Sequence, residues 1–201
     1  MTTDNGHQQR TLQTLRAATE SVLSASSYSG DNLADDLRDR AREAALRLLS
    51  IRERSSKELT DRLRDKGFPT EIVDDLVTRF LEIKLLDDER FAREWVTSRA
   101  QHSARGKSVL RQELRHKGIP TPVIDAVLES LSPEIEEDSA RMLLSRKLRA
   151  IDPASLSDRE IYRKQQRRLY NMLARRGFSS ELAQRVTQDA LTEHRANSST
   201  E

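Results

Sequence analysis

Three of the six glycines in this chain of 201 residues follow a basic residue at the end of a helix-like pattern. The three segments read LTDRLRDKGFP (59–69), LRQELRHKGIP (110–120) and LYNMLARRGFS (169–179). Leucines stand eight and four residues before each glycine, and an apolar residue follows it. Glycine adopts the left-handed conformation that closes a helix without a steric penalty. Gly67, Gly118 and Gly177 are therefore predicted to end three equivalent helices.

Each of these helices is expected to be the middle one of a three-helix unit. Ser55 with Glu58, and Ser157 with Glu160, have the capping-box spacing that starts a helix. A further helix is expected after each glycine, because a good N-cap residue follows. These N-cap residues are Thr70, Thr121 and Ser180.

The spacing of apolar residues predicts an all-α fold. They recur every three or four residues from about residue 38 onward, and no stretch alternates as a strand does. Small helical units are stabilised by stacking, so we expect three tandem three-helix repeats in an elongated, curved array. The expected parts are a flexible N-terminal extension (1–37), repeats at 38–85, 86–131 and 132–195, and a disordered tail (196–201).

The sequence offers little support for an enzyme. It contains no cysteine, and its four histidines lack the spacing of a metal site. Gly106-Lys107-Ser108 resembles part of a phosphate loop, but that motif requires glycine where Gln101 stands. The acidic run at 87–89 fits the start of a helix, where carboxylates cap free N–H groups. We expect no catalytic residue, cofactor or metal.

Charge is distributed unevenly, although the net charge is only +2. Residues 71–94 carry a net charge of −4, whereas 99–117 carry +5 and 141–176 carry +8. Several basic residues are spaced by four, which aligns them along one side of a helix. Such rows suit phosphates or an acidic protein surface, although many charged rows only solubilise a helix. The candidate contact residues are Arg105, Lys107, Arg111, Arg115, Lys117, Arg163, Lys164, Arg167, Arg168, Arg175 and Arg176.

Four segments together resemble the RecX regulatory proteins of bacteria. They are LRLLSIRERSSKELTDRLRDKGF (46–68), LLDDERFAREWVTSR (85–99), GKSVLRQELRHKGI (106–119) and RLYNMLARRGF (168–178). The resemblance implies nine helices in three tandem repeats and a modulator of the RecA recombinase that is not an enzyme. It implies binding in the groove of the RecA–DNA filament, where the protein inhibits ATPase, strand-exchange and coprotease activities. Such a protein acts in recombination, DNA repair and the SOS response.

The expected partners are the RecA filament and single- and double-stranded DNA. The first ten residues are polar and lack the apolar core of a signal peptide, and no apolar run reaches membrane-spanning length. A cytoplasmic monomer without membrane contact is therefore expected. Two alternatives remain open at this stage. One is a DNA-binding helical protein that acts without a recombinase, and the other is a structural scaffold. Tyr162 and Tyr170 are the only rings in the most basic stretch, so base stacking has few candidates.

Overall fold

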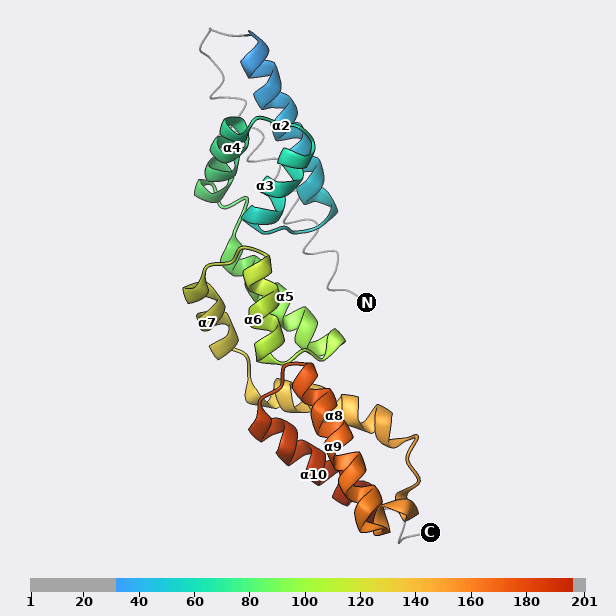
Figure 1. Ribbon diagram of the computed structural model, residues 1–201. Coiled ribbons are helices and arrows are strands. Elements are labelled where there is room, and N and C mark those ends of the chain that lie inside the picture. Colours follow the sequence, from blue (N-terminus) through green and yellow to red (C-terminus); the bar gives the residue numbers. More distant parts are fainter. Residues whose placement is uncertain (1–31, 197–201) are drawn as a thin grey trace, which may run out of the picture. The chain divides into compact units, whose positions relative to one another are not determined.

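The computed structural model describes residues 32–196 and confirms an all-α fold (Figure 1). Most of the expected N-terminal extension and tail lie outside these residues. Within them the chain forms nine α-helices and one 3-10 helix, and no strand. The helices are α2 (Asn32–Ile51), α3 (Ser56–Asp65), α4 (Thr70–Glu82), α5 (Asp88–Ser103), α6 (Lys107–His116), α7 (Thr121–Glu129), α8 (Pro133–Leu148), α9 (Arg159–Arg175) and α10 (Ser180–Ala196), with η1 (Pro153–Ser157) before α9.

The helices follow one another as three sets of three. The middle helices are α3, α6 and α9, and each is closed by a glycine with positive φ. The φ values are +86° for Gly67, +78° for Gly118 and +88° for Gly177, as the sequence pattern predicts. The helix α2 begins at Asn32, earlier than the expected boundary at residue 38. An ion pair between Asp35 and Arg38, one turn apart, supports this added segment.

The helix starts differ in detail from the sequence prediction. The Glu58 N–H donates to Ser55 Oγ at 3.1 Å, which confirms the predicted cap of α3. The predictions for Thr70 and Thr121 are wrong, because each is already the first helical residue. A proline with extended backbone occupies the cap position before each threonine. The caps predicted at Ser157 and Ser180 are each wrong by one residue, because the capping side chains belong to Asp158 and Ser179.

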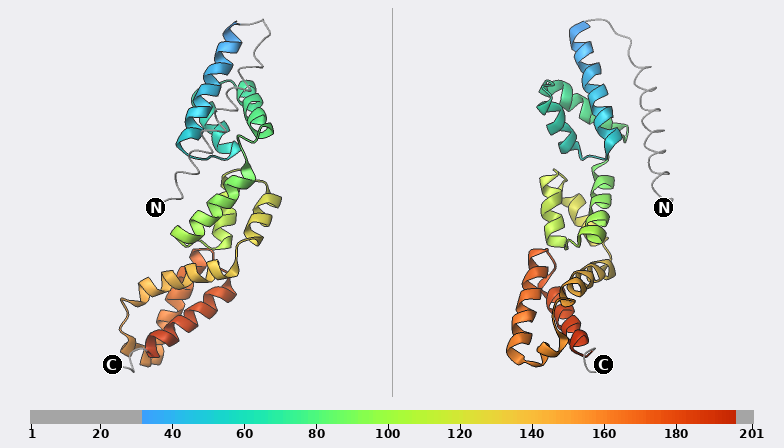
Figure 2. Two further views of the ribbon diagram at one scale, coloured as in Figure 1. Left: turned by 180° about the vertical axis from the view of Figure 1, so that it is seen from behind. Right: turned by 90° about the vertical axis from the view of Figure 1, so that its right-hand side faces the viewer.

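The chain divides into two compact units, and each has its own core. The first comprises the described residues up to Phe91 together with Lys117–Ile119. Its core contains Leu59, Leu63 and Phe80. The second comprises the remaining residues from Ala92 onward. It includes α8, α9 and α10, which pack together around a second core that Leu144, Leu156, Leu173, Val186 and Leu191 help to form (Figure 2).

Candidate functional site

The start of a middle helix meets the glycine turn of the next repeat at two equivalent places. Ser55 Oγ donates a 2.7 Å hydrogen bond to the carbonyl oxygen of Lys117. The Gly106 N–H donates at 2.9 Å to the carbonyl oxygen of Arg176. Ser55 and Gly106 each stand twelve residues before the glycine of their own repeat, and Lys117 and Arg176 directly precede a glycine. The repeats are therefore joined by a recurring hydrogen bond to the carbonyl that precedes the glycine, donated by a side chain at Ser55 and by the backbone at Gly106.

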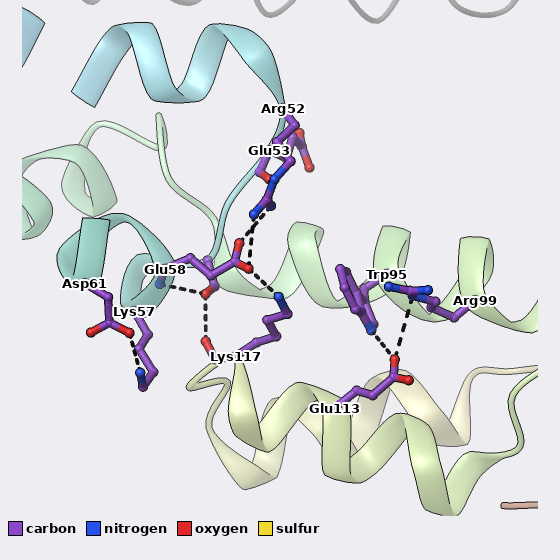
Figure 3. Close-up of polar contacts among 10 residues, drawn as sticks. Arg52, Glu53, Lys57, Glu58, Asp61, Trp95, Arg99, Glu113 and Lys117 are labelled. Atoms are coloured by element: carbon purple, nitrogen blue, oxygen red, sulfur yellow. Dashed lines mark hydrogen bonds and ion pairs between the residues drawn. The ribbon is translucent and has the colours of Figure 1, made fainter. Parts of the chain in front are cut away.

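The side chains of Lys117 and Arg176 take part in the same two contacts. Lys117 Nζ donates to the Glu58 carboxylate, which also accepts from Arg52 at 2.9 Å (Figure 3). Burial disfavours the charged form of Glu58, but hydrogen bonds from Arg52 and Lys117 outweigh it and lower its pKa to about 2. The Arg176 guanidinium donates to the Ser103 carbonyl at 2.9 Å. Both predicted contact residues thus have structural partners within the chain.

Three further candidates, at the start of α6 or along it, are paired with carboxylates. Arg105 Nε lies 3.8 Å from Glu113, and Lys107 Nζ lies 3.8 Å from Glu136. Arg111 forms an ion pair with Asp125 of α7. Since Glu136 is only 9% exposed, the Lys107 pair also compensates a nearly buried charge. These partners reduce the positive field that α6 presents to an external anion.

The remaining six candidate residues have no carboxylate partner in the part of the chain that the structure describes. In residues 32–196, none of them has a carboxylate oxygen within 4.0 Å of its charged nitrogen atoms. They are Arg115 on α6 and, on α9, Arg163, Lys164, Arg167, Arg168 and Arg175. The five residues on α9 are all exposed, and we call them the α9 basic cluster. Among the candidate residues, the positive charge left unpaired within residues 32–196 is therefore concentrated on α9.

A polar pocket of about 370 Å³ lies between α9 and α10, beside part of this cluster. Helix α9 contributes Arg163, Gln166, Arg167 and Tyr170, and α10 contributes Gln184 and Thr187. Sequence reasoning identified the two arginines and noted Tyr170 as a ring candidate. It missed both glutamines and Thr187, because no motif marks them and only the packing of α10 on α9 brings them together.

Trp95 and the Gly-Lys-Ser motif have structural roles. The Trp95 indole donates to Glu113 at 2.9 Å, and the Arg99 guanidinium lies 4.4 Å from the ring centroid (Figure 3). A Cβ on Gly106 would lie 2.3 Å from the Gly177 backbone, so glycine is required there for the contact between repeats. This agrees with a helix entrance rather than a phosphate loop.

The described residues also bear on metals and membranes. No group of three or more histidine and acidic residues among them could hold a metal ion. None of the helices in residues 32–196 combines the length and apolar character needed to cross a bilayer. His102 and His116 each contact the carbonyl four residues earlier in their own helix, as surface histidines do.

Comparison with family models matches the chain three times in succession. Residues 41–80 match the first three-helix domain of RecX, 87–128 the second and 134–187 the third. The chain belongs to the RecX family. The Regulatory protein RecX of Streptomyces lividans is 40% identical over 155 residues, which covers 77% of this chain and 79% of that protein. The Corynebacterium efficiens RecX is 35% identical over 187 residues, covering 90% and 89%.

Solved RecX structures share the fold. The crystal structure of RecX from Lactobacillus salivarius matches with a TM-score of 0.67 at 23% identity, over 79% of this chain and 98% of that one. A second crystal structure, of a regulatory protein RecX, has a TM-score of 0.66 and covers 83% and 84%. These structures confirm the fold, and the family models confirm both the resemblance found in the sequence and the three tandem three-helix domains.

Proposed function

We propose that this RecX-family chain regulates the RecA recombinase by binding the RecA–DNA filament. Its curated relatives are named regulatory proteins, and all three RecX domains are present. In this proposal the chain inhibits RecA ATPase, strand exchange and coprotease activity, and thereby modulates recombination and repair. It acts by binding and contributes no catalytic group.

The exposed α9 basic cluster, which has no carboxylate partner within residues 32–196, is the main observation that supports this proposal. An arginine with no carboxylate partner retains its full capacity to bind an external carboxylate or phosphate in a bidentate manner. Four members, Arg163, Lys164, Arg167 and Arg168, lie within two turns of α9. In a filament they would meet acidic side chains of RecA or DNA phosphates, and contacts to adjacent subunits would restrain the movements that ATP hydrolysis requires.

The experiment measures single-strand-DNA-dependent ATP hydrolysis by RecA as the chain is titrated. The test variant changes Arg163, Lys164, Arg167 and Arg168 to Gln. The control changes four exposed basic residues of the first repeat to Gln, namely Arg40, Arg47, Arg62 and Lys66. We expect the test variant to need at least tenfold more protein for half-inhibition, and the control to resemble the wild type. Equal inhibition by both variants, with helicity intact by circular dichroism, contradicts the role of α9.

A second candidate function is DNA binding without a recombinase, and the same cluster favours it. Each phosphate neutralised by Arg or Lys releases counterions, so binding to naked DNA would weaken steeply as salt rises. Wild-type chain that binds DNA in this way but leaves RecA ATPase unchanged at saturation would support this alternative and contradict the first.

A further inference from the structure

We propose that the pocket between α9 and α10 binds one nucleotide unit of a single DNA strand. The phosphate would lie between Arg163 and Arg167, and the base would lie against Tyr170. This inference concerns direct nucleotide recognition by the third repeat. It rests on the DNA-binding role that the α9 basic cluster supports and assigns that role a specific pocket, but it does not require regulation of a recombinase.

We assign the phosphate to the part of the pocket that Arg163 and Arg167 line. These residues are four apart on α9, so their side chains share one side of the helix. Both are exposed and line the pocket, and within the described residues neither has a carboxylate partner. Two like charges at this spacing repel each other, and a bound phosphate would relieve that repulsion. By contrast, Arg111 on α6 is already paired with Asp125.

We assign the base to the part of the pocket that Tyr170 and two glutamines line. Tyr170 stands three residues after Arg167 on the same helix and is half-buried, which holds its ring in place. Gln166 and Gln184 place amide groups on either side of the pocket, from α9 and α10. An amide offers both a donor and an acceptor to the edge of a base, and an aromatic ring offers a stacking surface.

The size of the pocket suits a nucleotide better than a single acidic side chain. Its volume of about 370 Å³ falls within the range of small-ligand pockets, whereas one carboxylate would fill only a small part of it. A carboxylate would also leave the ring and both amides without a role. An acidic peptide from a partner protein is therefore the less suitable occupant, and it becomes an outcome of the test.

Thr187 gives an independent indication of a ligand. It lies on the α10 side of the pocket and is 0% exposed, yet among the described residues its hydroxyl has no hydrogen-bond partner. Buried hydroxyls in native proteins are nearly always paired. Thr97 and Thr192, which are exposed helical threonines, each donate at 2.9 Å to the carbonyl four residues earlier. The Thr187 hydroxyl makes no such bond, and a group that binds deeply enough to reach it would supply the missing partner.

The first experiment measures binding of the full chain to a short fluorescent single strand of DNA, by anisotropy and without RecA. The variant R163Q/R167Q removes two charges from the pocket, and the matched control K147Q/R149Q removes two from exposed positions at the end of α8, outside the α9 basic cluster. We expect at least tenfold weaker binding for the first variant and less than threefold for the control. Equal losses would show a diffuse electrostatic surface and overturn the proposal.

The second experiment locates the base. A strand carrying 5-iododeoxyuridine is irradiated in the complex, and the adduct is mapped by mass spectrometry. We expect the adduct on Tyr170, and we expect Y170L to weaken binding at least fivefold. An adduct confined to other residues overturns the proposal. Y170L also removes the adduct site, so Q184A, at an exposed position, serves as a second pocket variant that should weaken binding without affecting helicity.

Competition distinguishes the possible occupants. A deoxynucleoside monophosphate added at the same phosphate concentration should displace little of the strand, because it lacks the neighbouring phosphates. Full displacement would assign the pocket to free nucleotides and overturn strand binding. Displacement by an acidic peptide of equal charge would assign it to a protein partner. Loss of RecA inhibition in R163Q/R167Q with unchanged strand affinity would overturn this inference alone and leave the proposed function intact.

Discussion

Gly118 approaches Lys57 so closely that a Cβ on the glycine would lie 2.6 Å from the Lys57 Cβ. Gly177 repeats this relationship with Val109, whose backbone nitrogen would lie 2.5 Å from the added atom. Gly67 has the same position in its own repeat, but within the described part of the chain no atom lies within 4 Å of its added Cβ. The glycine therefore ends a helix in all three repeats and permits close packing between repeats in two.

Alanine at these glycines should separate the two roles. All three residues have positive φ, so each alanine should lower the free energy of unfolding by about 1 kcal/mol through backbone strain. G177A should cost at least about 3 kcal/mol, because its methyl group also overlaps the Val109 backbone. Urea unfolding followed by circular dichroism measures the difference. A G67A variant as unstable as G177A would contradict the packing role.

Ser55 should matter more than a serine that only caps a helix. Its hydroxyl accepts from the Glu58 N–H and donates to the Lys117 carbonyl, and the residue is fully buried. S55A should therefore lower the free energy of unfolding by roughly 2–3 kcal/mol, since it removes two hydrogen bonds. S179A is the control, because Ser179 is exposed and caps only α10, which is worth about 1 kcal/mol. Equal losses in urea unfolding would contradict the additional role of Ser55.

Glu58 should make stability depend on acid pH. Its pKa of about 2 in the folded chain lies below its ordinary value of 4.5, so its stabilising effect is complete above pH 4.5 and is lost as pH falls toward 2. E58Q should lower the free energy of unfolding at pH 7 by roughly 2 kcal/mol, because Arg52 and Lys117 lose their shared anion. The gap between E58Q and wild type should close over that acid range.

The exposed pair between Lys57 and Asp61 provides the control for this pH dependence. Both side chains are about half exposed, and such pairs contribute little to stability. D61N should therefore change the free energy of unfolding at pH 7 by less than about 0.5 kcal/mol. Thermal or urea unfolding at several pH values measures both variants. A gap between E58Q and wild type that stays constant from pH 7 to pH 2.5 would contradict the role of Glu58.

Local features of the fold could be predicted from the sequence, whereas contacts between distant segments could not. The positive φ of Gly67, Gly118 and Gly177 follows from neighbouring residues alone, and so does the cap at Ser55. The restraint on Gly118 from Lys57 depends on how one repeat meets the next, which no local pattern encodes. A spacing rule also cannot show that two prolines would displace the caps of α4 and α7.

The same distinction applies to the candidate site. The rows of basic residues on α6 and α9 look equivalent in sequence, because four-residue spacing reports only which side of a helix a residue occupies. Arg111 is paired with Asp125 of the following helix, and Lys107 is paired with Glu136 of the next repeat. Neither side chain is therefore free to bind an external anion. The pocket depends on Gln184 and Thr187, whose sequence surroundings carry no signal for binding.

Thr187 should show opposite effects on stability and on binding. In T187V a methyl group replaces a buried hydroxyl that has no partner in the described structure, so the free energy of unfolding should rise by about 1 kcal/mol. Affinity for the DNA strand should fall at least threefold, because the bound nucleotide loses a hydrogen bond. T192V is the control, since Thr192 is exposed and bonds its own helix, and it should leave strand affinity unchanged. Urea unfolding and anisotropy measure the two effects, and a T187V chain that binds the strand as wild type does would show that the hydroxyl does not face a ligand.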